Sequence, residues 1–187
     1  ILREGWRAEG DRWPEIVHNM QNRIGISSGQ MVTGNMGSEA RMNYTMMGDN
    51  VNTAARLESS AKQYGVYIQI ADSTYQPVKD RVVVRDLDNV RVLGKNEPVK
   101  VWELISEKGK EPESYKKILP AYHEALDLYK NQEWSKAIEA FKASDELEEM
   151  FGGRKTNPSR IYIPRCEHYL DNSPGDDWDG VWTLTSK

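Results

Sequence analysis

The sequence contains little cysteine, no long apolar run and no excess of positive charge, and each shortage excludes a class of protein. Cys166 is the single cysteine among 187 residues, so a disulfide framework is excluded, a reducing compartment is expected, and Cys166 is interpreted as a packing residue. No apolar run approaches the roughly 18 residues of a membrane-spanning helix, so no membrane contact is expected of this segment. The formal net charge of −4 provides no basic field to attract nucleic acid.

What the sequence does contain is typical of folded domains. Hydrophobic residues make up 38% and charged residues 29%, which is ordinary for a soluble globular protein. The length is sufficient for one or two small domains with cores of their own. The chain begins at Ile1 without a methionine or a signal peptide, which favours a fragment of a longer protein.

The first part of the chain carries both strand and helix signals. Residues 23–38, RIGISSGQMVTGNMGS, indicate two strands joined by a turn, which predicts a hairpin, followed by an irregular or extended connection. A helix is expected at about 50–64, because Gly65 is a typical residue just beyond a helix end. Residues 82–105 indicate two or three further strands.

The composition changes at residues 106–114, SEKGKEPES, whose charges, glycine and proline indicate a linker. Two amphipathic helices are expected after it, at about 115–130 and 134–150, with a third short helix within 160–170. The small and aromatic residues that a tetratricopeptide-type pair needs are Ala125, Ala137 and Phe141. Since one such pair cannot bury its own apolar face, we expect it to pack against the first domain or another chain.

The helix expected at 50–64 separates its polar residues from its apolar ones. At about 100° per residue, one polar column contains Asn52, Arg56, Ser59 and Gln63. The apolar stripe beside it contains Val51, Ala54, Ala55, Leu57 and Ala61. The column fits either a solvated face without a partner or an anion site. The alanines allow close packing on a sheet, and the positive helix N-terminus and the Arg56 guanidinium both favour a phosphate.

Several motifs follow one another across residues 15–105. They are RIGI at 23–26, GNMGS at 34–38, GDNVN with RLE at 48–58, and LGK with EPVKVWEL at 93–104. In this order they resemble the C-terminal half of a class III nucleotidyl cyclase catalytic domain. The resemblance implies an α+β, ferredoxin-like core, present here in part at residues 1–105, followed by a linker at 106–114 and a small α-helical appendage at 115–187.

The resemblance also implies roles for individual residues. In the family's N-x-x-x-R motif the amide orients the ribose and the guanidinium stabilises charge that develops on the α-phosphate, and these positions are Asn52 and Arg56 here. Thr45, seven residues before Asn52, stands at the position that reads the purine base. A hydroxyl there resembles the adenylyl cyclases and favours ATP. Without the surrounding motif, Thr45 is equally consistent with a surface hydroxyl.

Two departures from the family pattern concern the triphosphate and the metal. Leu93 stands where the family has a lysine that touches the triphosphate, and Lys95 is either its substitute or a solvated turn lysine. The two aspartates that bind Mg²⁺ or Mn²⁺ in the family belong to its first half, so no metal ligand is expected in this chain. Asp86, Asp88 and the acidic residues within 176–179 are interpreted as turn and capping residues.

These inferences predict part of an adenylate cyclase that converts ATP into cyclic AMP and pyrophosphate in intracellular signalling. Family members work as dimers, so a homodimer through the cyclase domain is expected, in the cytoplasm, with a parent protein that an N-terminal sensor could anchor in a membrane. The fragment alone is expected to be inactive without the metal-binding half. The alternative is a degenerate, non-enzymatic cyclase-like module for protein interactions, which Leu93 favours and which intact Thr45, Asn52 and Arg56 oppose.

Overall fold

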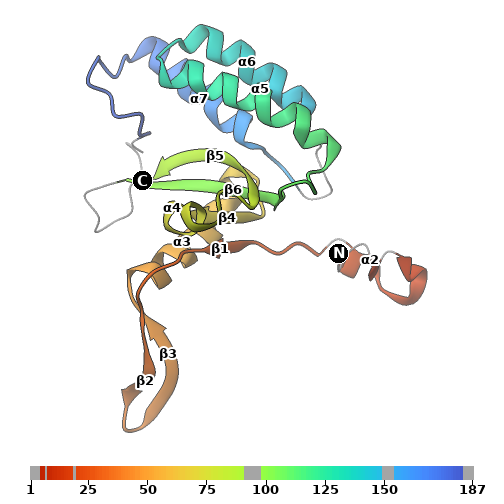
Figure 1. Ribbon diagram of the computed structural model, residues 1–187, viewed down its shortest axis with the longest axis vertical. Coiled ribbons are helices and arrows are strands. Elements are labelled where there is room, and N and C mark those ends of the chain that lie inside the picture. The colour runs from red at the N-terminus through yellow and green to blue at the C-terminus, as the bar shows by residue number, and fades with distance from the viewer. Residues whose placement is uncertain (1–4, 7, 19, 91–97, 149–153, 183–187) are drawn as a thin grey trace.

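A four-stranded mixed sheet forms the centre of the protein, whose computed structural model describes residues 5–182 except 7, 19, 91–97 and 149–153 (Figure 1). The strands lie in the order β1-β4-β6-β5 and span Ile24–Ile26, Ile68–Ala71, Val99–Glu107 and Val82–Val90. β1 is parallel to β4, and the other neighbours are antiparallel. Short helical segments span Gly10–Arg12 (η1), Glu15–His18 (α2), Asp72–Tyr75 (α4) and Gln76–Val78 (η2). The sheet and its helices confirm the predicted α+β class.

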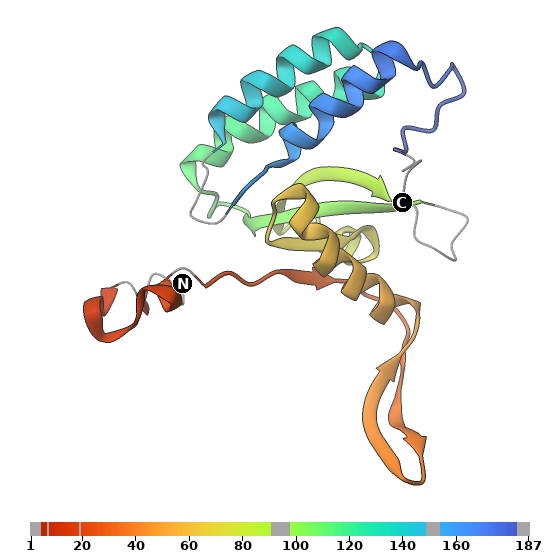
Figure 2. The same ribbon diagram turned by 180° about the vertical axis from the view of Figure 1, so that it is seen from behind.

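Helix α3, Asp49–Tyr64, packs against β1 and β4 and crosses the sheet (Figure 2). It ends as predicted, because Gly65 adopts the left-handed conformation with φ of 64°. The predicted close approach to the sheet is present: a Cβ atom added to Gly25 of β1 would lie 2.1 Å from the carbonyl oxygen of Ala54. The predicted stripe is wrong at Ala55, which is exposed, because the buried line consists of Thr53, Leu57, Ala61 and Tyr64.

Strands β2, Val32–Ser38, and β3, Arg41–Met47, form a separate antiparallel ribbon that projects away from the sheet (Figure 1). The predicted hairpin within 23–38 is therefore wrong. Its first strand, β1, joins the central sheet, and its second pairs with β3, the segment that we expected to be irregular or extended, from Val32 opposite Met47 to Ser38 opposite Arg41. Gly37, with φ of 144°, permits the tight return, since a Cβ atom there would lie 2.0 Å from the Arg41 carbonyl oxygen.

The C-terminal helices α5, Glu113–Lys130, α6, Trp134–Leu147, and α7, Pro158–Asp171, form a helical layer beside β5 (Figure 1). The two expected helices are present as α5 and α6, but the third helix is as long as α6, so the expectation that it is short is wrong. Asn157 caps α7, because its side chain accepts a hydrogen bond from the backbone N–H of Arg160. Cys166 is fully buried in this layer, which confirms it as a packing residue.

Aromatic side chains fill the helical layer. Tyr122 contacts Phe141 and Tyr162 edge-on or at a steep angle, while Phe141 stacks on Tyr162 with ring centroids 5.0 Å apart. At the other end of the layer the rings of Trp134 and Trp178 lie 5.3 Å apart. Tyr169 contacts both of them, and Trp182 packs on Tyr169.

None of the helices in the described ranges combines the length and the apolarity needed to cross a bilayer.

Candidate functional site

The exposed side of α3 carries the polar column that the sequence predicts. Asn52 and Arg56 lie one turn apart and are both exposed, as are Ser59 and Gln63 further along the helix. Thr53 and Leu57, each one residue further along the chain, are buried against the sheet. The amide and the guanidinium are therefore directed outward from a helix whose opposite side is fixed, an arrangement that leaves both groups accessible to a ligand.

Thr45 belongs to the strand that leads directly into this helix. It lies on β3 opposite Gly34 and is exposed, and Gly48 connects β3 to α3. Thr45, Asn52 and Arg56 thus come from one continuous strand–helix unit. Lys95, the fourth predicted site residue, and Leu93 lie outside the described residues.

The N-terminal end of α3 is held by contacts that the sequence analysis did not identify. The Asn50 amide accepts a hydrogen bond from Ser27 Oγ at 3.2 Å and donates one to the Gln30 carbonyl at 3.2 Å. From the other side, Thr74 Oγ1 lies 3.1 Å from Ser28 Oγ. These contacts fix the loop between β1 and β2 next to the first turn of α3, whose backbone N–H groups favour an anion. Asn50 lies within the GDNVN motif, so this motif was the sequence signal that could have identified these contacts.

The acidic residues of β5 lie within a strand and pair with distant cations, so the interpretation of Asp86 and Asp88 as turn and capping residues is wrong, although Asp88 also accepts a hydrogen bond from the backbone N–H of Asn89 at 2.8 Å. Asp86 accepts hydrogen bonds or ion pairs from Lys100 at 3.0 Å and Lys130 at 2.8 Å. Asp88 is buried and pairs with Arg165. Among the residues that the structure describes, no group of three or more His, Cys, Asp or Glu side chains could hold a metal ion.

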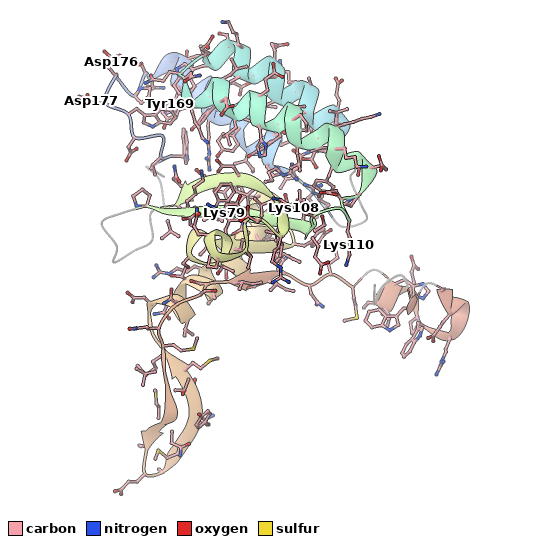
Figure 3. All side chains as sticks on the ribbon, viewed as in Figure 1. Lys79, Lys108, Lys110, Tyr169, Asp176 and Asp177 are labelled. Atoms are coloured by element: carbon pink, nitrogen blue, oxygen red, sulfur yellow. The ribbon has the colours of Figure 1, made fainter. Side chains whose placement is uncertain are left out.

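The acidic residues after α7 lie elsewhere. Figure 3 shows Asp176 and Asp177 on the loop at the outer end of the helical layer, on the opposite side of the sheet from the ribbon of β2 and β3. Asp179 accepts a hydrogen bond from the backbone N–H of Val181 at 3.0 Å, which is a local turn contact. These carboxylates are therefore separate from the column on α3.

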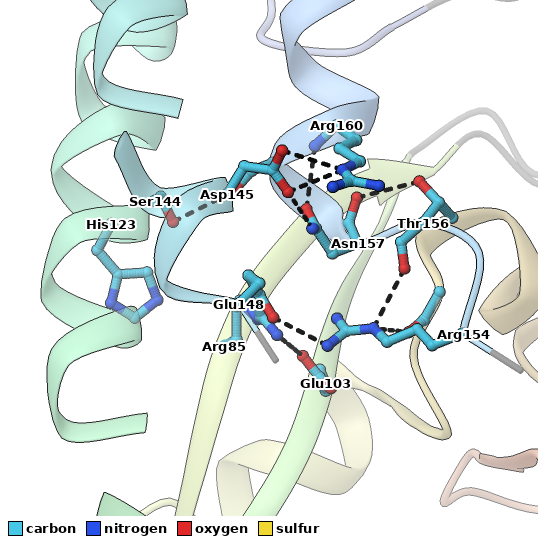
Figure 4. A network of polar contacts seen from close by, with 12 residues as sticks. Arg85, Glu103, His123, Ser144, Asp145, Glu148, Arg154, Thr156, Asn157 and Arg160 are labelled. Carbon is cyan, nitrogen blue, oxygen red and sulfur yellow. Dashed lines mark hydrogen bonds and ion pairs between the residues drawn. The ribbon is translucent and has the colours of Figure 1, made fainter. Parts of the chain in front are cut away.

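A buried network of charges joins the sheet to the helical layer (Figure 4). Arg85 on β5 pairs with Glu103 on β6 at 2.7 Å and with Glu148 at the end of α6. Glu148 also accepts from Arg154 at 2.9 Å. Burial lowers the pKa of Arg85, but Glu103 and Glu148 more than offset this effect and raise it above its ordinary value, so the guanidinium remains charged. This network is structural, because none of its members is exposed.

The family model and the related sequences place the chain among cyclases. The family model described as "Adenylate and Guanylate cyclase catalytic domain" matches residues 10–106. The "Adenylate cyclase, terminal-differentiation specific" of Dictyostelium discoideum is 34% identical over 152 residues, which cover 79% of this chain and 7% of that protein. "Adenylate cyclase 1" of Rhizobium meliloti is 34% identical over 85 residues, or 46% of this chain and 13% of that protein. The chain thus spans a small part of these relatives.

Solved cyclase structures also match part of the chain. The adenylyl cyclase CyaB from P. aeruginosa is 32% identical and superimposes with a TM-score of 0.43, covering 59% of this chain and 53% of that one. The guanylyl cyclase Cya2 is 34% identical with a TM-score of 0.36, over 44% and 41% of the two chains. The Dictyostelium alignment covers 79% of this chain and therefore extends past residue 106 into the helical layer.

Proposed function

The chain belongs to the family of adenylate and guanylate cyclase catalytic domains, and on this premise we propose that it is part of an adenylate cyclase that forms cyclic AMP in intracellular signalling. In this reaction the ribose 3′-oxygen of ATP attacks the α-phosphorus, the bond to pyrophosphate breaks, and the hydroxyl proton is lost. The observation that carries the proposal is the exposed Asn52–Arg56 pair, one turn apart on a helix that is fixed on the sheet. The Dictyostelium relative, whose alignment covers 79% of this chain, is named an adenylate cyclase.

The two side chains have complementary tasks in this proposal. The Arg56 guanidinium stabilises the charge that develops on the α-phosphate in the pentavalent transition state. The Asn52 amide binds the ribose and holds its 3′-hydroxyl near the attack geometry. Because α3 is packed on β1 through Gly25 and Ala54, both groups are held by one rigid element.

The finer assignments concern the nucleotide. Thr45 is proposed to meet the adenine edge, since a hydroxyl both donates and accepts hydrogen bonds and β3 leads directly into α3. Lys95 is proposed to contact the triphosphate in place of the family lysine that Leu93 replaces. ATP is therefore the proposed substrate.

The metal ions are proposed to come with the other half of the domain. The two family aspartates that bind Mg²⁺ or Mn²⁺ belong to the first half of the domain, and they would hold the ions that assist the displacement at the α-phosphorus. This is why we propose that the fragment alone is inactive. Pure fragment incubated with ATP and Mn²⁺ should form no cyclic AMP, and clear turnover would show that its own carboxylates bind the ions.

A homodimer is proposed because the ribbon of β2 and β3 exposes apolar side chains. Met42, Tyr44, Met46 and Met47 of β3 are all exposed, and Tyr44 is 75% exposed. A two-stranded ribbon is marginally stable by itself, and a contiguous exposed apolar surface favours a protein partner. We keep the division into residues 1–105, 106–114 and 115–187, with α5 and α6 as a tetratricopeptide-like pair, as part of the same proposal.

The test of this function is nucleotide choice in the complete enzyme. ATP should be cyclised in preference to GTP, and Thr45→Ala should reduce that preference about five- to tenfold, the effect of one lost hydrogen bond. The matched control is Ser59→Ala, which removes an exposed hydroxyl from the side of α3 that carries Asn52 and Arg56. It should leave the preference for ATP unchanged. A wild-type preference for GTP would overturn the adenylate assignment. No turnover of either nucleotide, with the metal-binding half present, would favour the non-enzymatic module.

A further inference from the structure

The last turn of α3 is connected to the helical layer by a buried polar contact. Tyr64 is 4% exposed, and its hydroxyl donates to Asp88 Oδ2 of β5 at 2.5 Å. Arg165 of α7 donates to the same oxygen at 2.7 Å and lies 3.5 Å from the Tyr64 hydroxyl. One carboxylate oxygen therefore joins a helix of the cyclase core, a strand of the sheet and a helix of the C-terminal layer.

A second contact holds the residue that follows α3. Arg154, which precedes α7, donates through Nε to the Gly65 carbonyl at 2.8 Å and to the Thr156 carbonyl at 3.1 Å. The two backbones are so close that a Cβ atom on Gly65 would lie 2.0 Å from the Thr156 carbonyl oxygen. The C-terminal end of α3 is thus fixed by two segments of the helical layer that are distant from it in sequence.

The burial of these groups makes the connection strong. Asp88 and Arg165 are 7% and 9% exposed, and the guanidinium lies over the rings of Tyr162 and Trp182. Burial raises the pKa of Tyr64, and the Asp88 carboxylate raises it further, so the hydroxyl keeps the proton that it donates. Tyr64 and Arg165 both donate hydrogen bonds to the Asp88 carboxylate. Moving α7 away would remove Arg165 and leave the buried Asp88 carboxylate without its counterion.

We propose that Tyr64, Asp88 and Arg165 form a clamp through which the helical layer sets the position of α3, and with it the positions of Asn52 and Arg56. The inference rests on the proposed function only in giving α3 a catalytic task. α3 is held near its middle by the Ala54–Gly25 contact and at its end by the clamp. A displacement of α7 would therefore tilt or release the helix that presents the catalytic pair, so Tyr64, Asp88 and Arg165 are positioning residues.

The first test measures amide hydrogen exchange of this chain with Tyr64→Phe. The variant removes one hydroxyl and leaves the Asp88–Arg165 pair in place, so the fold should persist. The matched control is Tyr162→Phe, which removes an equally buried hydroxyl of α7 that donates to the Leu87 carbonyl of β5 and, among the described residues, makes no hydrogen bond to α3. Relative to the β5–β6 amides, exchange at residues 57–64 should become about tenfold faster in Tyr64→Phe, because a hydrogen bond to a charged group is lost. The control should leave that ratio unchanged.

The second test measures turnover of the complete enzyme. Tyr64→Phe should lower kcat by about tenfold with little change in KM, because a small misplacement of catalytic groups is costly in the transition state. Tyr162→Phe should keep the wild-type kcat.

The outcomes distinguish this inference from the proposed function. Equal exchange at 57–64 in both variants, or wild-type kcat in Tyr64→Phe, would overturn the clamp while leaving the cyclase activity in place. Absence of activity in the wild-type enzyme, together with faster exchange in Tyr64→Phe, would support the clamp and contradict the proposed function.

Discussion

The helical layer and the β2–β3 ribbon are two attachments to the same sheet, and they are built in opposite ways. The helical layer meets the sheet through buried ion pairs, such as Arg85–Glu148 and Asp88–Arg165, and the Arg85 guanidinium lies over the ring of Tyr122 on α5. The ribbon presents exposed methionines and Tyr44 and belongs to neither core cluster of the described residues. The layer therefore has its partner within the chain, whereas the ribbon has an apolar surface that favours a second molecule.

The largest expected effect concerns the buried ion pairs of Arg85, which lie between the sheet and the helical layer. Arg85→Met should lower the free energy of unfolding by about 3–5 kcal/mol, because it leaves the buried Glu103 and Glu148 without their shared counterion. Thermal unfolding followed by circular dichroism measures the loss. The matched control is Lys142→Met, which removes one side of the exposed Lys142–Glu139 pair and should cost less than about 1 kcal/mol. Equal losses in both variants would contradict a special role for the buried network.

The second effect concerns Asn52 and Arg56 of the polar column on α3. Their side chains are exposed, like those of the ribbon, but we expect them to act on a bound nucleotide. Arg56→Ala should change stability by no more than about 0.5 kcal/mol. In the complete enzyme it should lower kcat about 10²–10³-fold with little change in KM, because the guanidinium acts on transition-state charge. Asn52→Ala should behave similarly.

The control for the column is Lys62→Ala, which removes an exposed cation from the last turn of the same helix and should keep the wild-type kcat. If Arg56→Ala raised KM alone, Arg56 would merely hold the substrate. If neither parameter changed, the column would be a solvated face.

The third effect tests whether the exposed apolar surface of the ribbon binds a second copy of the chain. Tyr44→Ser should weaken self-association about tenfold or more, since large exposed aromatic residues contribute strongly to interfaces. Sedimentation equilibrium over a range of concentrations measures the dissociation constant. Leu170→Ser removes an apolar side chain that is 51% exposed on α7 and should leave the association unchanged. A wild-type chain that stays monomeric at every concentration would contradict the proposed interface.

The smallest effect is a pH dependence at the junction of β5 and α5. His123 Nε2 accepts a hydrogen bond from the Asp86 backbone N–H at 3.3 Å, and burial lowers the pKa of His123, although Asp86 and Asp127 oppose this. A group whose pKa is lowered by folding contributes stability above its unfolded pKa of about 6.5 and loses it as the pH falls through the folded value. The free energy of unfolding should therefore decrease as the pH is lowered below about 6.5.

His123→Gln tests this assignment, because glutamine keeps an acceptor but does not titrate. Its stability near pH 8 should lie within about 1 kcal/mol of wild type, and its decline in acid should be shallower. An identical slope in both proteins would assign the pH dependence to other titrating groups.

The sequence was informative where one local rule was enough. The end of α3 follows from Gly65, and the exposed column follows from helical periodicity. The hairpin prediction failed because two consecutive strands were assumed to pair, whereas β1 pairs with β4, which lies over forty residues further along. The partners of Asp86 and Asp88 could not be predicted either, since Asp88 and Arg165 are 77 positions apart and no periodicity connects them.

The candidate site was predictable for a different reason than the fold. Asn52 and Arg56 lie within one helix, so their spacing alone sets their relative orientation. The clamp on Tyr64 depends on the packing of α7 against β5, which is a property of the folded chain. Sequence patterns of short range therefore identified the exposed pair that is proposed to face a ligand, but not the residues that hold its helix in place.

The aromatic cluster gives the helical layer an optical signature. Trp134, Trp178 and Trp182 belong to or pack against the core of the layer, and the sequence contains six tryptophans in all. Rings as close as the 5.3 Å between Trp134 and Trp178 couple their electronic transitions, so circular dichroism near the indole bands should include a contribution from this layer. The emission of these tryptophans and their coupled dichroism should change when α7 separates from α6. The docking of the layer could therefore be followed in solution without any added label.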